Sequence, residues 1–144
     1  AAGRVLAGLW LDSAGELPAL PQLLIPVPLH RDRLRERGYN QALELARPLA
    51  HALRLPVDAK ILARTRATPA QTNLDAKTRR KNLRGAFEVD DLALKSVSAG
   101  VAHVALIDDV MTTGATLREC ARALKRAGFA RVDVWALARA PKSR

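Results

Sequence analysis

Apolar residues recur along the chain in two patterns, as short continuous runs and at helical spacings. Four runs rich in branched apolar residues are predicted strands: 23–29, 57–64, 101–107 and 131–138. Apolar positions three and four residues apart predict helices over 40–54 and 116–127. Because strands and helices alternate, we expect an α/β domain with a mainly parallel central sheet flanked by helices, in three layers.

Prolines and a capping residue refine these boundaries. Pro26 and Pro28 lack ladder donors, which favours an edge or strand-end position for the first strand. Asn40 is suited to cap the helix that follows it, and Pro48 within that helix predicts a kink or an early break near Ala46. The run 101–107 is almost continuously apolar, which is typical of a parallel strand buried on both faces.

The rest of the chain is expected to contain connecting segments and short helices. Residues 1–22 are predicted as the end of a helix over 1–11 and a connector, and 23–144 as a single domain. Three polar segments are predicted loops: 30–38, 64–74 and 90–100. Residues 75–83 are predicted as a short basic helix that stops before Gly85.

Composition fits one domain of 144 residues with an aliphatic core, because half of the residues are apolar and only 3% are aromatic. The single cysteine, Cys120, excludes an internal disulfide and an all-cysteine metal site, and we expect a buried free thiol. His51 and His103 show no ligand spacing and are expected to be ordinary histidines. No apolar run reaches the ~18–20 residues of a membrane span, and no secretory signal is visible, so we expect a cytoplasmic protein without a membrane partner.

The net charge of +10 changes the picture of the partners. An excess of 24 Lys and Arg over 14 Asp and Glu attracts polyanions over long distances. The basic residues concentrate in 31–37 and 64–84. Composition alone leaves two classes of partner open, a nucleic acid and a small, highly charged phosphate.

The segment ALIDDVMTTGAT carries the clearest candidate chemistry. We expect Asp108 and Asp109 to emerge where the buried strand ends, at the edge where open α/β sheets bind ligands. Hydroxyl groups, a glycine and a helix start then follow, which together suit a phosphate: Thr112, Thr113, Gly114, Ala115 and Thr116. Either feature alone also fits a plain strand end or helix cap, but their direct succession favours a ribose 5-phosphate. Walker and Rossmann glycine motifs are both absent.

These residues also resemble a known family. IDDVMTTGAT resembles the phosphoribosyl-diphosphate (PRPP) motif of type I phosphoribosyltransferases, and is most similar to their ComF/GntX-like branch. The segments 27–46 and 64–87 resemble other parts of that branch, so the resemblance covers roughly 23–140. Members of the branch usually carry an N-terminal zinc ribbon with four cysteines, which these 144 residues do not contain.

The resemblance implies a role for each matching residue. Asp108 and Asp109, the catalytic acids, would accept hydrogen bonds from the ribose hydroxyls, and residues 112–116 would surround the 5-phosphate. Three residues after the first strand would lie near the pyrophosphate: His30, Arg31 and Arg33. A flexible loop over the site would include Arg66, Gln71 and Arg79. Mg²⁺ would enter with PRPP, with the two aspartates as candidate ligands.

The implied activity is Mg²⁺-dependent transfer of the phosphoribosyl group from PRPP to an unidentified acceptor. Two alternatives stay open. One is a domain that binds PRPP or a nucleotide without turnover. The other is a protein that interacts with single-stranded DNA, suggested by the charge and by the branch's link to competence and DNA uptake; the shortage of aromatic residues leaves little for base stacking. A homodimer is also left open.

Overall fold

A three-stranded parallel sheet forms the centre of the molecule. The computed structural model describes residues 19–65, 77–78, 81, 84–111 and 114–139. The strand order in the parallel sheet is β1 (Leu23–Pro26), β4 (His103–Met111) and β5 (Arg131–Arg139). A second, antiparallel sheet pairs β2 (Leu62–Arg64) with β3 (Phe87–Val89). The helices in the described residues are α2 (Arg31–Arg37), α3 (Gln41–Leu53), α5 (Asp91–Lys95) and α6 (Ala115–Arg126). The expected α/β class with a mainly parallel sheet is confirmed.

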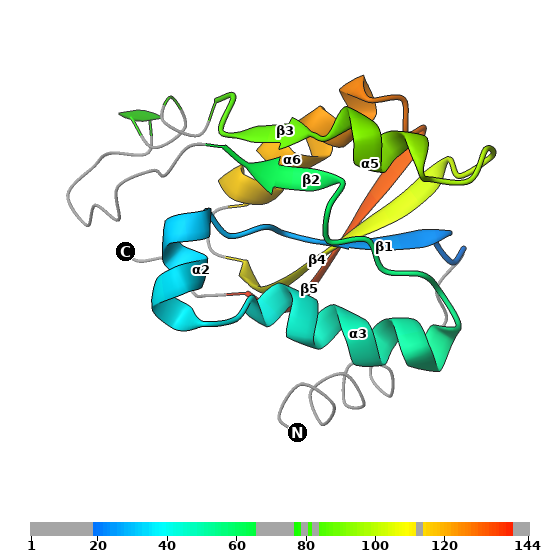
Figure 1. The fold of residues 1–144 in the computed structure, drawn as a ribbon, viewed down its shortest axis with the longest axis horizontal. Coiled ribbons are helices and arrows are strands. Elements are labelled where there is room, and N and C mark those ends of the chain that lie inside the picture. The colour runs from blue at the N-terminus through cyan, green and yellow to red at the C-terminus, as the bar shows by residue number, and fades with distance from the viewer. Residues whose placement is uncertain (1–18, 66–76, 79–80, 82–83, 112–113, 140–144) are drawn as a thin grey trace.

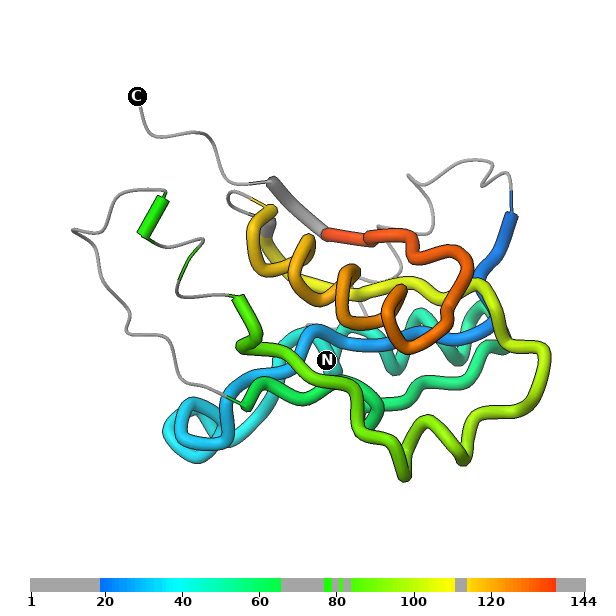
Figure 2. Tube along the Cα trace, turned by 90° about the horizontal axis from the view of Figure 1, so that it is seen from above, coloured from blue at the N-terminus to red at the C-terminus, as the bar shows by residue number. Residues whose placement is uncertain are grey.

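The two faces of the parallel sheet pack against different elements, because successive side chains of a strand point to opposite faces. Leu24, Ala105 and Trp135 pack with the apolar side of α3. Ile25 and Leu106 belong to the core on the other face, together with side chains of α6, β2 and β3. Figure 1 shows α3 below the sheet and α6, β2 and β3 above it, and Figure 2 shows α6 beside the β2–β3 pair.

The position of β1 agrees with its prolines. Pro26 is the last residue of β1, which forms one edge of the three-stranded sheet. On the other side of β1, only Val57 forms an isolated parallel bridge, with Leu24. The residues 104–107 of the neighbouring β4 have no exposed surface, which confirms a strand buried on both faces.

The basic segment 30–38 contains helix α2, so its prediction as a loop is wrong. The Nδ1 atom of His30 accepts a hydrogen bond from the backbone N–H of Asp32 at 3.3 Å and caps the first turn. Gly38 ends the helix in the left-handed region, with φ of 79°. These start and stop signals are present in the sequence, but the helix has no buried residue and therefore no apolar periodicity to indicate it.

Helix α3 continues through Pro48, so of the predicted kink or early break near Ala46, the break is wrong. The cap is as predicted, because Oδ1 of Asn40 accepts the backbone N–H of Ala42 at 2.9 Å. Proline lacks the donor that would reach the carbonyl of Glu44, and Glu44 is exposed, where water can bond that carbonyl. Leu49 and its neighbours on the buried side pack on the sheet and stabilise the continuous helix.

The predicted strand over 57–64 is two separate features. Val57 forms only its bridge with Leu24, and β2 begins later and pairs with β3 outside the parallel sheet. Asp58 separates the two, because its Oδ1 accepts the backbone N–H of Lys60 at 2.8 Å and forms a local turn. Strand β3 itself was not predicted.

The segment 90–100, expected as a loop, contains the short helix α5. Asp90 caps it, accepting the backbone N–H of Ala93 at 2.9 Å. Strand β5 and helix α6 lie within about one residue of their predicted bounds. The predicted helix over 1–11 and most of 64–74 lie outside the described residues. Of the predicted helix over 75–83, residues 77, 78 and 81 are described and are helical.

Among the helices that the structure describes, none combines the length and apolar character needed to cross a membrane.

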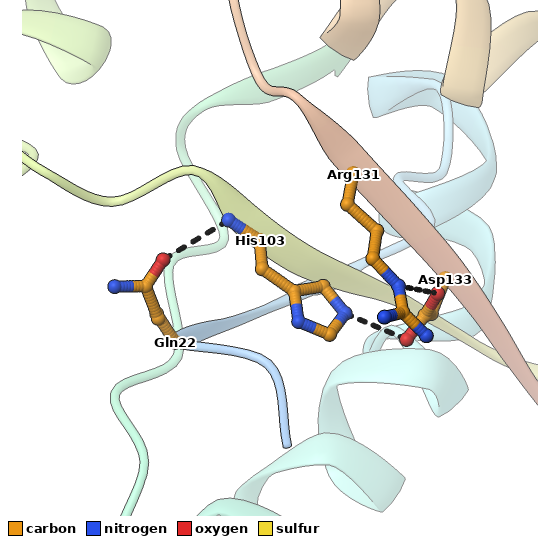
Figure 3. Close-up of polar contacts among 4 residues, drawn as sticks. All are labelled: Gln22, His103, Arg131 and Asp133. Carbon is orange, nitrogen blue, oxygen red and sulfur yellow. Dashed lines mark hydrogen bonds and ion pairs between the residues drawn. The ribbon is translucent and has the colours of Figure 1, made fainter. Parts of the chain in front are cut away.

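A group of polar side chains connects the strands at their amino ends (Figure 3). Oε1 of Gln22, just before β1, accepts the backbone N–H of His103 at 3.0 Å. Between β4 and β5, Nε2 of His103 lies 2.6 Å from Oδ2 of Asp133, and Nε of Arg131 donates to Oδ1 of Asp133 at 3.1 Å. Partial burial favours a higher pKa for Asp133, but the hydrogen bonds from His103 and Arg131 outweigh it and lower that pKa. His103 therefore has a structural role.

We predict that Asp133→Asn lowers the free energy of unfolding near pH 7 by roughly 1 kcal/mol, because a charge-assisted hydrogen bond between β4 and β5 is lost. Since the folded pKa of Asp133 lies below the unfolded value, its contribution is present above about pH 4 and disappears as the pH falls through the folded pKa. Urea unfolding at several pH values measures both effects. The matched control Glu88→Gln removes an exposed carboxylate and should change neither; equal stability of Asp133→Asn and the wild type near pH 7 would contradict the role.

Candidate functional site

The unequal lengths of β1 and β4 place the acidic pair. β1 ends at Pro26, which is opposite Ile107. β4 continues to Met111, paired beyond this point with β5 alone. Asp108 and Asp109 therefore lie within a strand, where the sequence predicted that they would follow one. They still lie beyond the carboxyl end of the edge strand, which is the region where parallel sheets bind ligands.

The side chain of Asp108 lies on the face of the sheet that α6 covers. Val104 and Leu106 belong to the core that includes α6, and Asp108 continues their alternation along the strand. The electrostatics agree, because the charge of Asp108 raises the pKa of the buried Cys120 thiol on α6, after the larger effect of burial. Cys120 is a buried free thiol, as expected.

Both aspartates are half-buried and bond to the adjacent backbone. Oδ1 of Asp108 accepts the N–H of Asp109 at 2.9 Å, and Oδ1 of Asp109 accepts the N–H of Val110 at 2.8 Å. The pKa of Asp108 is raised to about 7, mainly by burial. A side-chain hydrogen bond with Asp109 and the negative charge of Asp109 also raise it, whereas the hydrogen bond from the backbone N–H of Asp109 lowers it. Negative charge on this partly buried pair is therefore unfavourable, and a bound cation or hydroxyl donors would stabilise it.

Helix α6 begins directly beyond this pair. Gly114 is the residue before the helix and has φ of 78°, in the left-handed region that glycine adopts without strain. Ala115 and Thr116 of the first turn are half-buried. Gly114 offers no side chain as a cap, so the position in front of the helix suits an anion. Thr112 and Thr113 lie outside the described residues.

The three residues predicted near the pyrophosphate lie in different positions around α2. The side chain of His30 is only 13% exposed and caps the helix. Arg31 is exposed and Arg33 is half-buried. Figure 1 shows α2, the end of β2 and the start of α6 at the same end of the molecule.

Arg64 was predicted only as the end of a strand and the start of the basic segment 64–84, and the structure gives it a defined position near the candidate site. It is the last residue of β2 and stacks over the ring of Phe87, with its guanidinium carbon 5.4 Å from the ring centre. Burial lowers the pKa of Arg64, and the positive charge of Arg33 lowers it further, so the two guanidinium groups are close enough to repel. Arg64 also lies near the acidic pair, because the pKa of the Cys120 thiol is raised by the charge of Asp108 and lowered by that of Arg64. The available signal was a cation that both ends a predicted strand and begins a basic segment.

A groove of about 660 Å³ lies beside this group of residues and not over the aspartates. Arg31 and Arg64 line it, and the remaining described lining comes from α2 and the residues before it, from β2 and the segment before it, and from α5 with its two flanking residues. The proposed flexible-loop residues lie outside the described part of the chain: Arg66, Gln71 and Arg79.

The donor set is suited to sharing a metal with a ligand. Among the described residues, no group of three or more His, Cys, Asp or Glu side chains could hold a metal ion by itself. The two carboxylates of Asp108 and Asp109 are the hard oxygen donors that Mg²⁺ prefers, and Mg²⁺ commonly takes its other ligands from substrate phosphates and water.

Comparison with known proteins gives a family. A model of the family described as "Phosphoribosyl transferase domain" matches residues 36–144. Competence protein F of Haemophilus influenzae is 44% identical over 121 residues, which are 84% of this chain and 52% of that protein. DNA utilization protein YhgH of Salmonella typhi is 41% identical over 120 residues, 83% of this chain and 50% of that protein. The chain thus spans about half the length of these curated relatives.

A solved structure of Trypanosoma cruzi hypoxanthine phosphoribosyl transferase is 13% identical, with a TM-score of 0.45 over 98% of this chain and 71% of that chain. The family match covers most of the chain and includes the acidic pair, Gly114 and α6. It confirms the family that IDDVMTTGAT indicated, and the names of the relatives agree with the ComF/GntX-like branch. This chain belongs to the phosphoribosyl transferase domain family.

Proposed function

We propose that this chain binds PRPP with Mg²⁺ and transfers its phosphoribosyl group to an acceptor. The observation that carries the proposal is the position of Asp108, which lies on the same face of the sheet as α6 and close to Cys120 in that helix. One ligand can then place a diol at the carboxylate of Asp108 and a phosphate at the helix start that follows Gly114. Ribose 5-phosphate has both groups.

The transfer would require little covalent chemistry from the protein. The bond between the anomeric carbon and the pyrophosphate breaks through an oxocarbenium-like transition state, as in glycoside hydrolysis. The chain contributes by holding the ribose hydroxyls on Asp108 and Asp109 and the 5-phosphate at Gly114, Ala115 and Thr116, together with Thr112 and Thr113.

The leaving pyrophosphate would meet a positive region. Figure 1 shows α2 and the end of β2 at the same end of the molecule. Arg31 and Arg33 belong to α2 and Arg64 ends β2, and these arginines would stabilise the charge that develops on the pyrophosphate. His30 would act by capping α2 and positioning Arg31 and Arg33. Mg²⁺ would neutralise the phosphate oxygens when it is bound with PRPP.

Binding and turnover need separate measurements. PRPP with Mg²⁺ should raise the melting temperature of the wild type, and Asp109→Asn should weaken binding about 10- to 100-fold, because a charged hydrogen-bond acceptor is lost. Glu44→Gln removes an exposed carboxylate on α3 and serves as the matched control. Release of pyrophosphate with a panel of nucleobases and amines then distinguishes a transferase from a domain that only binds PRPP. The absence of any stabilisation by PRPP would contradict the proposed function.

Proton release should accompany binding. Hydroxyl donors and Mg²⁺ favour the charged form of Asp108, so its pKa should fall from about 7 when PRPP binds. We expect up to one proton to leave near pH 6 and almost none near pH 8.5, measured by calorimetry in two buffers of different ionisation enthalpy. Asp108→Asn, measured with the same ligand, subtracts the protons that PRPP itself releases. Equal proton release by this variant and the wild type would contradict the role of Asp108 in binding PRPP.

The burial of Asp108 should also be visible without any ligand. Because its folded pKa is raised, the wild type should lose stability relative to Asp108→Asn as the pH rises from about 4 to about 7, with a constant difference above that. Melting temperatures of both proteins across this range test the prediction. If Asp108→Asn were less stable than the wild type near pH 8, the charged carboxylate would stabilise the fold, and the prediction would be contradicted.

A second candidate function is binding of single-stranded DNA, favoured by exposed arginines on one side of the site. Arg31, Arg35 and Arg37 of α2 are all exposed. If they contact phosphates, changing Arg35 and Arg37 to Gln should reduce the slope of log affinity against log salt by about 1.4. Fluorescence anisotropy with an oligothymidylate measures this slope. Replacement of the exposed Arg47 and Arg54 of α3 by Gln is the control, and an equal effect of both double variants would contradict a site on α2.

A further inference from the structure

The groove beside the candidate site has the size and lining of a second ligand site, which shares Arg31 and Arg64 with the proposed pyrophosphate site. Its volume of about 660 Å³ falls within the range of small-molecule pockets, about 300–1,000 Å³. Most of its described lining is apolar, including Leu29, Leu34, Leu62 and Leu92. The charged side chains that line it are Arg31, Lys60, Arg64 and Asp90.

The charges are arranged along the groove. The backbone N–H of Asp90 bonds to the carbonyl of Ile61 at 2.8 Å, which places Asp90 opposite the residue that precedes β2. Arg64 lies three residues further along the chain, at the end of β2, a separation of about 10 Å at the rise of a strand. Arg31 and Arg64 therefore form a cationic end without a lining acid, whereas Asp90 lies toward the other end, near Lys60, which precedes Ile61.

The cationic end is held in place by its surroundings. Arg64 stacks on Phe87, so its guanidinium group has a restricted position, and Arg31 enters the groove from the start of α2. The charge of Arg33 adds to the positive potential at Arg64. An anionic group at this end would relieve the repulsion among the arginines.

The apolar walls are open to solvent. The side chain of Leu92 on α5 is 77% exposed and that of Leu34 on α2 is 41% exposed. These two leucines come from different elements and line one groove. An apolar body between them would remove both from water, which favours binding.

Charge decides between the types of occupant. A second copy of this chain related by a two-fold axis would bring Arg31, Lys60 and Arg64 of both copies into one interface, and like charges would repel. Bases of a nucleic acid have no aromatic platform among the described lining residues. We propose that the groove binds a small organic acid, with its carboxylate at Arg31 and Arg64 and its apolar body between Leu34 and Leu92. The proposal does not depend on the transferase activity.

The test uses 4-phenylbutyrate as the probe and 4-phenylbutanamide as its neutral match, followed by NMR titration of the whole chain. We expect the acid to shift the backbone amides of residues 29–34, 60–64 and 91–96. The amide probe should bind about tenfold more weakly or worse, because a charge-assisted hydrogen bond is worth at least that factor. Arg31→Gln and Arg64→Gln should both weaken binding of the acid, and Arg31 is exposed, so its replacement does not endanger the fold.

Leu92→Gln distinguishes this site from the proposed pyrophosphate site. It should weaken 4-phenylbutyrate and leave the affinity for inorganic pyrophosphate unchanged, whereas Arg31→Gln should weaken both. Arg126→Gln, an exposed change on α6, should affect neither probe.

Four results would overturn the proposal. They are equal affinities of the acid and the amide, shifts confined to other segments, shifts of the groove amides with protein concentration alone, and displacement of the acid by a short oligothymidylate. The last two would identify a second copy or a nucleic acid as the occupant.

Discussion

The partial burial of Asp108 is the constraint on which the candidate site depends. β4 continues beyond the end of β1, and alternation along the strand places the carboxylate of Asp108 on the face that α6 covers, where it is partly buried. A buried carboxylate without a cation costs free energy, and the raised pKa of Asp108 expresses that cost. Such a carboxylate is suited to bind a ligand that provides hydroxyl donors and a metal. A stability cost at this position is therefore consistent with a binding role.

The positive side of the site comes from elements that are distant in the sequence. α2 follows β1, and Arg64 ends β2 in the antiparallel sheet. These elements gather at the end of the molecule where α6 begins (Figure 1). Arg33 and Arg64 repel each other, as the two aspartates do, so an anion with an attached diol would relieve both repulsions. The match between these two sets of charges supports a ligand that carries phosphate groups and a sugar.

Long, strongly patterned elements could be predicted, and short ones could not. β4 and β5 form the central sheet and have apolar runs, and α3 and α6 pack on that sheet and have apolar positions at helical spacing. Helix α2 has no buried residue, α5 has only five residues, and β3 has three. Their stability depends on caps such as His30 and Asp90 and on pairing with distant segments. These contacts leave little periodic signal in the chain.

The candidate residues of the site can be read from the sequence, because the adjacent acids, the glycine and the helix start are contiguous residues between 108 and 116. The sequence by itself also determined the class of fold, through the alternation of apolar runs and helical spacings. Tertiary structure alone decided that Asp108 lies within a strand, that Arg64 approaches Arg33, and that Arg31 shares a groove with Leu92. Each of these depends on where strands end relative to their neighbours and on which elements pack together, and pairing between distant segments sets both.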